Sequence, residues 1–368
     1  MSKTKIIAMY LPQYHRIPEN DEFWGEGFTD WVTVRNAKPL FKNHEQPKVP
    51  LNENYYDLSE EDNIIWQSEL ASQYGIDGFG VYHYWFNNEK NLLTKPAEII
   101  RDSKKVNISY FLAWDNANWV RSWSNVSGNV WTPLVDSKLV KDSTPQILIP
   151  YIIGDKSDWK NHYENLRSHF LNERYIKINN KPVFVVLNYS NTIGMMCDFW
   201  NELAINDGFN GMHFIMKIKE GIDIPNCYHR FKYEPVYSGW TKIGYCERIS
   251  DKVRKLFHRS SRVKISNYDI IWETILENAQ KDDNKMIYHG AFVAYDDTPR
   301  RGNRGRAVIG NNAEKFYNYL KQLEEISLSQ KKDFILLTAW NEWGEGAYLE
   351  PDTKEFFNYL ESIHKLKI

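Results

Sequence analysis

Two glutamates three residues apart, Glu342 and Glu345, are the side chains in this sequence best suited to chemistry. They lie in the segment TAWNEWGEG (338–346), directly after the apolar run 334–337. Carboxylates at the end of a buried strand are costly unless they are hydrogen-bonded or share a proton. Neighbouring tryptophans can raise the pKa of one carboxyl, and the glycines can admit a ligand. The pattern therefore favours paired acid–base work over structural ion pairing.

Cleavage of a glycosidic bond is the simplest chemistry for two carboxylates in an aromatic cleft. The usual arrangement places the acid and the nucleophile on different strands, whereas Glu342 and Glu345 belong to one loop. They would struggle to flank an anomeric carbon from opposite faces. Two alternatives stay open: a carboxylate elsewhere, such as Asp115 or Asp296, is the nucleophile, or the substrate supplies its own.

The elements that must position these carboxylates are short apolar runs that alternate with helical patterns. Seven runs are typical of buried parallel strands, and an eighth strand is expected around 233–236. The seven runs are 6–10, 78–82, 108–113, 182–187, 213–216, 291–294 and 334–337, and helical patterns lie at 59–75, 157–170, 195–206, 268–281 and 311–327.

This alternation predicts an α/β fold, a (β/α)8 TIM barrel that forms a single domain over residues 1–368, with a doubly wound open sheet as the alternative. Neither GxGxxG nor GxxxxGKS follows a strand, so the usual nucleotide site of an open sheet is not indicated. Two irregular regions, 121–146 and 240–267, are expected to be long βα loops that shape a cleft at the C-terminal face of the barrel.

Polar and aromatic residues follow strand after strand, at the face where barrel enzymes carry their reactive groups. Such residues can stack on a sugar ring and form hydrogen bonds with its hydroxyls. The candidate substrate-binding residues are Tyr10, Gln13, Tyr14, His83, Tyr84, Trp85, Trp114, Asp115, Asn116, Trp119, Tyr295, Asp296, Trp340, Asn341 and Trp343. Packing is the open alternative for several of them. Tyr84 and Trp85 could plug the barrel top, His83 is more typical of a packing histidine, and Asp115 could cap a helix.

The composition excludes several classes of function. The formal net charge of −2 offers no basic field for nucleic acid or an anionic membrane. Three cysteines with no CxxC spacing indicate neither a disulfide framework nor a zinc site, so no metal or other cofactor is expected. No signal-like segment or long apolar run is found, which predicts a soluble, cytoplasmic protein without a transmembrane segment.

Four strings of the sequence carry a family resemblance. Residues 7–34, 75–87, 179–186 and 338–352 (IAMYLPQYHRIPENDEFWGEGFTDWVTV, GIDGFGVYHYWFN, NNKPVFVV and TAWNEWGEGAYLEPD) resemble the WbsX family, which is related to the endo-α-mannosidases of glycoside hydrolase family 99. The resemblance runs from about residue 5 to residue 352. The first string adds Trp24 and Trp31 to the candidate substrate-binding residues.

The resemblance implies a (β/α)8 barrel and retaining chemistry on an α-linked, mannose-like sugar through a 1,2-anhydro sugar intermediate. Glu342 would be the general base that takes a proton from the sugar 2-hydroxyl, and Glu345 the general acid that protonates the leaving oxygen. Because the 2-hydroxyl is then the nucleophile, both carboxylates can approach from one loop. Members of the family are commonly encoded among O-antigen or capsule genes and are often labelled glycosyltransferases.

One position departs from the family pattern. Relatives often read W-A-N-E-x-W after the third strand, whereas this chain has Trp114-Asp115-Asn116-Ala117-Asn118-Trp119. Ala117 stands where a glutamate is expected, and Asp115 where a small residue is usual. Either a carboxylate has moved by two positions, or this subsite recognises a different sugar.

The leading hypothesis is a retaining glycosidase or transglycosidase that acts on a surface polysaccharide or its precursor. A glycosyltransferase that uses an activated sugar donor and a non-catalytic carbohydrate-binding barrel are the alternatives. The sequence does not indicate an oligomeric state.

Overall fold

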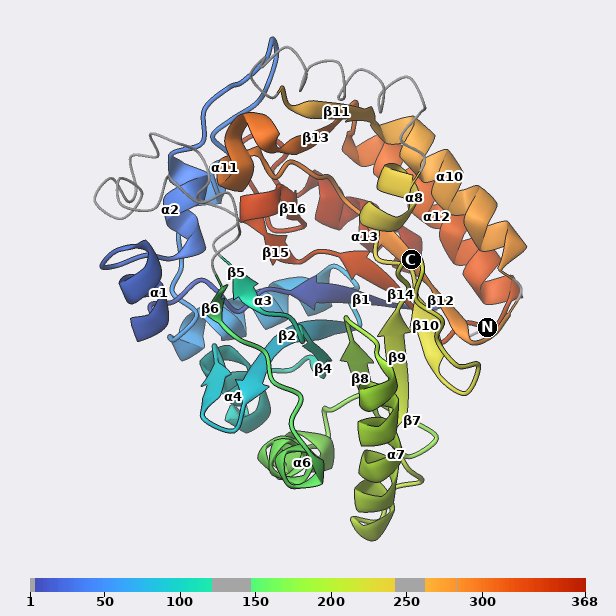
Figure 1. Cartoon of the computed structure of the whole chain (residues 1–368). Coiled ribbons are helices and arrows are strands. Elements are labelled where there is room, and N and C mark those ends of the chain that lie inside the picture. Colours follow the sequence, from blue (N-terminus) through green and yellow to red (C-terminus); the bar gives the residue numbers. More distant parts are fainter. Residues whose placement is uncertain (1–3, 121–146, 242–261, 283) are drawn as a thin grey trace, which may run out of the picture.

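Eight parallel strands close into a barrel in the computed structural model, which describes residues 4–120, 147–241, 262–282 and 284–368. The barrel strands are β1 (Lys5–Tyr10), β2 (Gly78–Asn87), β4 (Ser109–Trp114), β8 (Lys181–Val186), β9 (His213–Lys217), β10 (His229–Phe231), β12 (Ile287–Phe292) and β14 (Phe334–Thr338). β1 pairs with β14 on one side and with β2 on the other, which closes the sheet (Figure 1). The predicted (β/α)8 barrel is confirmed.

The long helices cover the outside of the barrel, and the short helices α1 (Pro18–Trp24), α2 (Asp30–Arg35) and α11 (Thr298–Arg301) contribute residues to the cavity at its carboxyl face. The remaining helices are α3 (Glu61–Gln73), α4 (Lys95–Asp102), α6 (Lys156–Leu171), α7 (Asn191–Asn206), α8 (Val236–Thr241), α10 (Tyr268–Lys281), α12 (Ala313–Ser329) and α13 (Asn358–Lys367). Short 3-10 turns are η1 (Leu51–Glu53), η2 (Gly302–Arg304) and η3 (Trp343–Glu345), and short strands are β3 (Lys90–Leu92), β5 (Trp119–Val120), β6 (Ile147–Ile149), β7 (Lys177–Ile178), β11 (Lys264–Asn267), β13 (Arg306–Ile309), β15 (Asn341–Glu342) and β16 (Ala347–Tyr348).

Local sequence explains where the long helices begin. The side chain of Ser190 accepts a hydrogen bond from the third residue of α7, and Asn312 does the same for α12. Such caps satisfy backbone N–H groups that have no partner within the helix. Along α12, Phe316, Leu320 and Leu323 recur at three- and four-residue spacing and are all buried, so this face packs on the barrel.

The eighth strand lies earlier than expected. It spans His229–Phe231, whereas residues 233–236 were predicted, and Val236 instead begins α8. Pro235 has no N–H group for the sheet, which ends strand pairing before it. The run 291–294 proves to be near the carboxyl end of β12, because that strand begins at Ile287.

The two predicted cleft loops are only partly described. Residues 121–146 lie outside the described residues, and β5 and β6 on either side of them pair with each other. Of the second loop, residues 242–261 lie outside the described part, but its end forms β11, which pairs with β13. Across the part of the chain that the structure describes, no helix is long and apolar enough to cross a membrane.

Candidate active site

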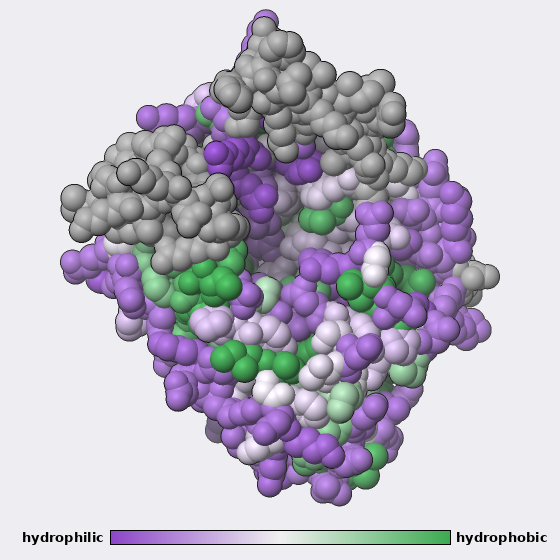
Figure 2. Space-filling model, viewed as in Figure 1, coloured by the Kyte–Doolittle hydropathy of each residue, from purple (hydrophilic) through white to green (hydrophobic). Residues whose placement is uncertain are grey.

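A cavity of about 420 Å³ opens at the carboxyl ends of the barrel strands. Glu342 and Glu345 line it together with residues from β2, β9 and α11 and from the segments that follow β4 and β8. Near α11 and β16, the space-filling view shows a hollow bordered by hydrophilic residues (Figure 2). A concave, polar site at this end of a barrel is where catalysis is expected.

The loop that carries the two glutamates is tied down on several sides. The side chain of Asn341 accepts a hydrogen bond from Leu11 N at 2.7 Å and donates one to Leu11 O at 3.0 Å. Trp343 N donates to the Tyr14 hydroxyl at 2.9 Å. These bonds fix β15 and η3 against the segment after β1, so the two carboxyls have defined positions.

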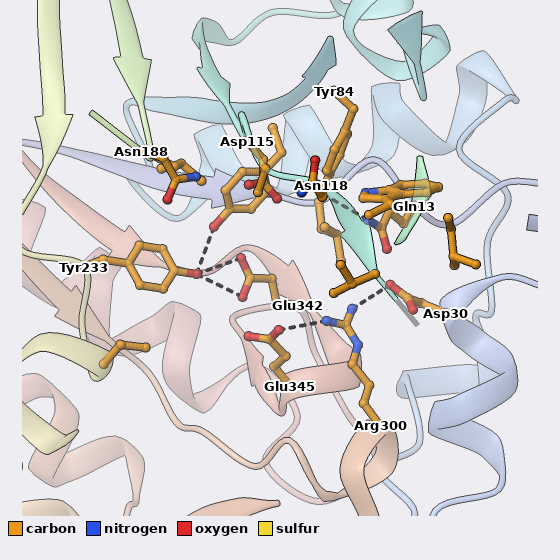
Figure 3. A pocket seen from close by; sticks show the side chains of 18 of the residues that line it. Gln13, Asp30, Tyr84, Asp115, Asn118, Asn188, Tyr233, Arg300, Glu342 and Glu345 are labelled. Atoms are coloured by element: carbon orange, nitrogen blue, oxygen red, sulfur yellow. Dashed lines mark hydrogen bonds and ion pairs between the residues drawn. The ribbon is translucent and has the colours of Figure 1, made fainter. Parts of the chain in front are cut away.

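Glu342 is the buried member of the pair, with 3% of its surface exposed. The Tyr233 hydroxyl lies 3.3 and 3.4 Å from its two carboxylate oxygens, and the Tyr82 hydroxyl lies 2.9 Å from that of Tyr233 (Figure 3). Burial, and then the negative charge of Glu345, raise the pKa of Glu342 to about 8. Glu342 therefore holds a proton at neutral pH.

Glu345 has a different partner. Arg300 Nη1 donates to its Oε1 at 2.8 Å, and Arg300 Nη2 donates to Asp30 Oδ2 at 2.7 Å (Figure 3). Burial raises the pKa of Asp30, and the charge of Arg300 opposes this rise. A guanidinium therefore lies against the Glu345 carboxylate, whereas the Glu342 carboxyl lies against the hydroxyl of Tyr233.

Of the nineteen candidate catalytic and substrate-binding residues, eight line this cavity. They are Gln13, Trp24, Tyr84, Asp115, Trp119, Tyr295, Glu342 and Glu345. Gln13 Nε2 donates to the Tyr84 hydroxyl at 3.0 Å, which holds both side chains on one wall. Asp115, one of the two alternative carboxylates, is among these residues and faces the same cavity as Glu342 and Glu345 (Figure 3).

The other eleven do not line it, because they pack or form hydrogen bonds elsewhere. They are Tyr10, Tyr14, Trp31, His83, Trp85, Trp114, Asn116, Asp296, Trp340, Asn341 and Trp343. His83 Nε2 lies 2.8 Å from His162 Nε2, and Trp85 stacks on the His162 ring, so both face α6. Asp296, the other alternative carboxylate, is bonded to His44 and Gln46, each at 2.7 Å.

Four of these eleven are held by contacts with other buried residues. Tyr10 donates to Gln67, Trp31 Nε1 donates to Tyr56 O, and Trp114 Nε1 donates to Trp85 O. Trp343 stacks on Tyr348, with ring centroids 3.7 Å apart. These four side chains therefore pack and position their neighbours. So do His83 and Trp85, for which packing is the alternative that the sequence leaves open.

Several cavity residues were not among the candidates. Among the polar and charged ones are Asp30, Tyr82, Asn188, Lys217, Lys219, Tyr233 and Arg300. Tyr82 and Lys217 lie at or near the carboxyl ends of β2 and β9, so the strand-end rule could have found them. Asp30 and Arg300 come from the short helices α2 and α11, where no such rule applies. Among the described residues, no group of three or more His, Cys, Asp or Glu side chains could hold a metal ion.

Solved structures with the same fold include glycoside hydrolases. The endo-α-mannosidase of family 99 from Bacteroides thetaiotaomicron matches with a TM-score of 0.57 and 13% identity, over 98% of this chain and 96% of that chain. A glycoside hydrolase-like protein matches with a TM-score of 0.55 and 12% identity, over all of this chain and 94% of that one. At such low identity these matches show the fold alone.

Sequence relatives identify the family. The chain is 25% identical over 373 residues to the uncharacterised protein WxcX from two strains of Xanthomonas campestris pv. campestris. This match covers 98% of the chain and 49% of WxcX, so the chain spans about half the length of the curated relatives it matches. Residues 6–363 match the family described as Glycosyltransferase WbsX, and the chain therefore belongs to the WbsX family of carbohydrate-active proteins.

Proposed function

We propose that this protein is a retaining glycosidase or transglycosidase that acts on an α-linked, mannose-like sugar of a surface polysaccharide or its precursor. The observation that carries the proposal is that Glu342 and Glu345 line one cavity in different surroundings: burial raises the pKa of Glu342, and Glu345 is bonded to the Arg300 guanidinium. The endo-α-mannosidase title of a protein with the same fold supports the choice of substrate class.

In the first step, Glu342 takes the proton of the 2-hydroxyl, and O2 attacks C1 to form a 1,2-anhydro sugar. The bond from C1 to the glycosidic oxygen breaks, and Glu345 protonates that oxygen. In the second step, Glu345 takes a proton from water or an acceptor hydroxyl, which attacks C1, while Glu342 returns its proton to O2. Two inversions at C1 give net retention.

The electrostatics of the site suit the state between these steps. At that point Glu342 is protonated and Glu345 is ionised. Burial favours the proton on Glu342, and Arg300 favours the charge on Glu345. A site that matches the charges of the reacting state better than those of the bound substrate lowers the barrier.

The test is turnover of oligosaccharides prepared from the surface polysaccharide of the organism that encodes this protein. Glu342→Gln and Glu345→Gln should each lower kcat by about 10²–10⁴-fold, the usual contribution of a general acid or base. On an aryl glycoside whose leaving group needs no proton, Glu345→Gln alone should keep a fast first step, seen as a burst of released phenol, because Glu345 is then needed only as the base of the second step. Glu325→Gln, on the exposed side of α12, is the matched control.

Product analysis by NMR gives an independent check. Retention of the anomeric configuration is expected, and a 2-deoxy substrate should be inert because it lacks the nucleophile. Inverted product, or wild-type turnover in either glutamine variant, would exclude the mechanism.

The name of the family favours a second candidate, a glycosyltransferase that uses an activated sugar donor. Such an enzyme should bind a nucleoside diphosphate. Calorimetric titration with GDP, UDP and their sugar conjugates separates the two functions, since the proposed glycosidase should bind none of them tightly.

A further inference from the structure

Two lysines in the cavity, Lys217 and Lys219, have no role in the reaction proposed above. Four cationic side chains line the cavity. Arg300 is paired with Asp30 and Glu345, and Arg301 lies 3.2 Å from Asp297. The remaining two, Lys217 and Lys219, form no salt bridge with any residue that the structure describes.

Lys217 ends β9 and lies next to the reacting groups. Its Nζ lies 4.4 Å from the centroid of the Tyr233 ring, and the hydroxyl of that ring bonds to Glu342. Burial lowers the pKa of this ammonium. A buried charge without a paired anion is costly, and a contact with an aromatic face offsets only part of that cost. Lys217 is thus a desolvated cation one tyrosine ring away from the proposed base.

Lys219 is held in place two residues further on. Its Nζ donates to Asn188 Oδ1, and Asn188 follows the neighbouring strand β8. Asn188 is itself fixed by Asn116, which donates to Asn188 O at 2.7 Å and accepts from Asn188 N at 2.8 Å. This arrangement positions the ammonium in the cavity before any ligand arrives, and it gives Asn116 a supporting task behind the wall.

Among the described residues that line the cavity, Asp115 is the carboxylate that interacts with both lysines, and one carboxylate does not balance two cations. Its charge interacts with Lys217 and Lys219, but burial raises its pKa, which weakens its negative charge. In the described part of the chain, two ammonium groups thus face one half-buried carboxyl. The β9 side of the cavity has an excess of positive charge, while the excess negative charge lies on the Glu345 and Asp30 side.

We propose that Lys217 and Lys219 bind an anionic group, a carboxylate or a phosphate, carried by the sugar at or next to the cleavage position. The substrate is therefore an acidic glycan rather than a neutral mannan. This inference rests on the proposed function for its substrate class, although the binding of the anion does not require turnover. Hydrogen bonds from two ammonium groups to an anion are charge-assisted and therefore stronger than those to a neutral hydroxyl.

The experiment compares matched neutral and anionic ligands by NMR titration. Methyl α-mannoside is set against its 6-carboxylate and its 6-phosphate, and the corresponding glucosides form a second series. In the wild-type protein the anionic member of at least one series should bind about tenfold or more tightly than its neutral parent, as charged hydrogen bonds would give. Added salt should reduce this preference.

Variants assign the preference to the two lysines. Lys217→Met and Lys219→Met should each remove most of it, and Lys219→Arg should keep it. Lys5→Met is the control, because it removes the same charge from an exposed position at the opposite end of the barrel. Thermal melts check folding, and Lys219→Gln gives a second variant at the more accessible position.

The outcomes separate this inference from the proposed function. The stronger of the carboxylate and phosphate series identifies the anionic group. Equal binding of neutral and anionic sugars, no binding of any anionic sugar, or methionine variants that behave as wild type would overturn the inference, even if the glutamine variants lose turnover. Tight binding of GDP or UDP without preference among the sugars would overturn it in favour of a donor diphosphate. A lysine-dependent preference in a protein without turnover would support it while the proposed function fails.

Discussion

Arg300 gives the two glutamates different surroundings, although it belongs to α11 and not to the loop that carries them. Glu342 meets tyrosine hydroxyls, whereas Glu345 meets a guanidinium that also holds Asp30. Arg300 has 6% of its side chain exposed and Asp30 has 2%, so this is an ion pair out of contact with water. Losing one partner of such a pair leaves the other charge without compensation.

Arg300→Met should therefore destabilise the fold by about 3–5 kcal/mol, as measured by urea unfolding at neutral pH. Adding Asp30→Asn should restore part of this loss, because the stranded carboxylate is removed. Arg167→Met is the matched control: it breaks an Arg–Asp pair of similar length, 2.8 Å, whose arginine is 44% exposed, and its cost should be far smaller. Equal costs for both arginine variants would contradict the buried pairing.

At the scale of elements, the loop between β14 and β16 is where backbone geometry and chemistry meet. Gly346 has a φ of +57°, and a Cβ there would lie 3.0 Å from Asp296 N, the group that donates to Glu345 O at 2.6 Å. The loop and the segment after β12 are therefore in close backbone contact beside the acid.

Gly346→Ala should cost about 1–3 kcal/mol through overpacking and should lower turnover by displacing Glu345. Gly310→Ala is the comparison: φ is +91° there, but a Cβ would meet no atom within 4 Å. The backbone strain at Gly310 is no smaller, so any larger effect at Gly346 measures the close contact. Equal unfolding energies and unchanged turnover would show that the loop has room to shift.

Most of the strands could be predicted because the sequence of a buried parallel strand is a nearly continuous run of apolar residues. The strand that was misplaced, His229–Phe231, is short and contains His229 and Arg230, so it carries no such signal. Glu342 and Glu345 were found because their types and spacing are visible in one segment. Arg300 and Asp30 are 270 residues apart, and their pairing exists only after the barrel closes.

The excess of predicted binding residues has a geometric cause. Successive side chains of a strand point to opposite faces. On β2, Tyr82 and Tyr84 line the cavity, while His83 and Trp85 face His162 on α6. The sequence shows this alternation but not which of the two sets faces inward, so the candidates included both.

At the scale of the whole molecule, buried titratable groups of two kinds set opposite limits on stability. Burial raises the pKa of Glu234 and Glu350 to about 7 and that of Glu342 to about 8. Burial also lowers the pKa of several histidines to about 3, which are His83, His169, His213 and His289. The glutamates bind protons more tightly in the folded chain than in the unfolded chain, and the histidines bind them less tightly. The two effects act over different pH ranges.

The signs of these shifts predict a stability maximum near pH 6–7. The raised glutamates bind protons more tightly when folded, so their contribution is complete below about pH 4.5 and is lost as the pH rises to 7–8. The histidines resist protonation when folded, so stability falls as the pH drops below about 6.5. Urea unfolding across this range should show stability falling on both the acid and the alkaline side of the maximum.

Glu342→Gln should flatten the fall on the alkaline side. The free energy of unfolding should rise by an amount on the order of a few kcal/mol at pH 8 and not at all at pH 4.5, whereas Glu325→Gln should follow the wild type. A Glu342→Gln curve parallel to that of the wild type would mean that Glu342 is already ionised in the folded protein, and the proton of the catalytic pair would then have to lie elsewhere.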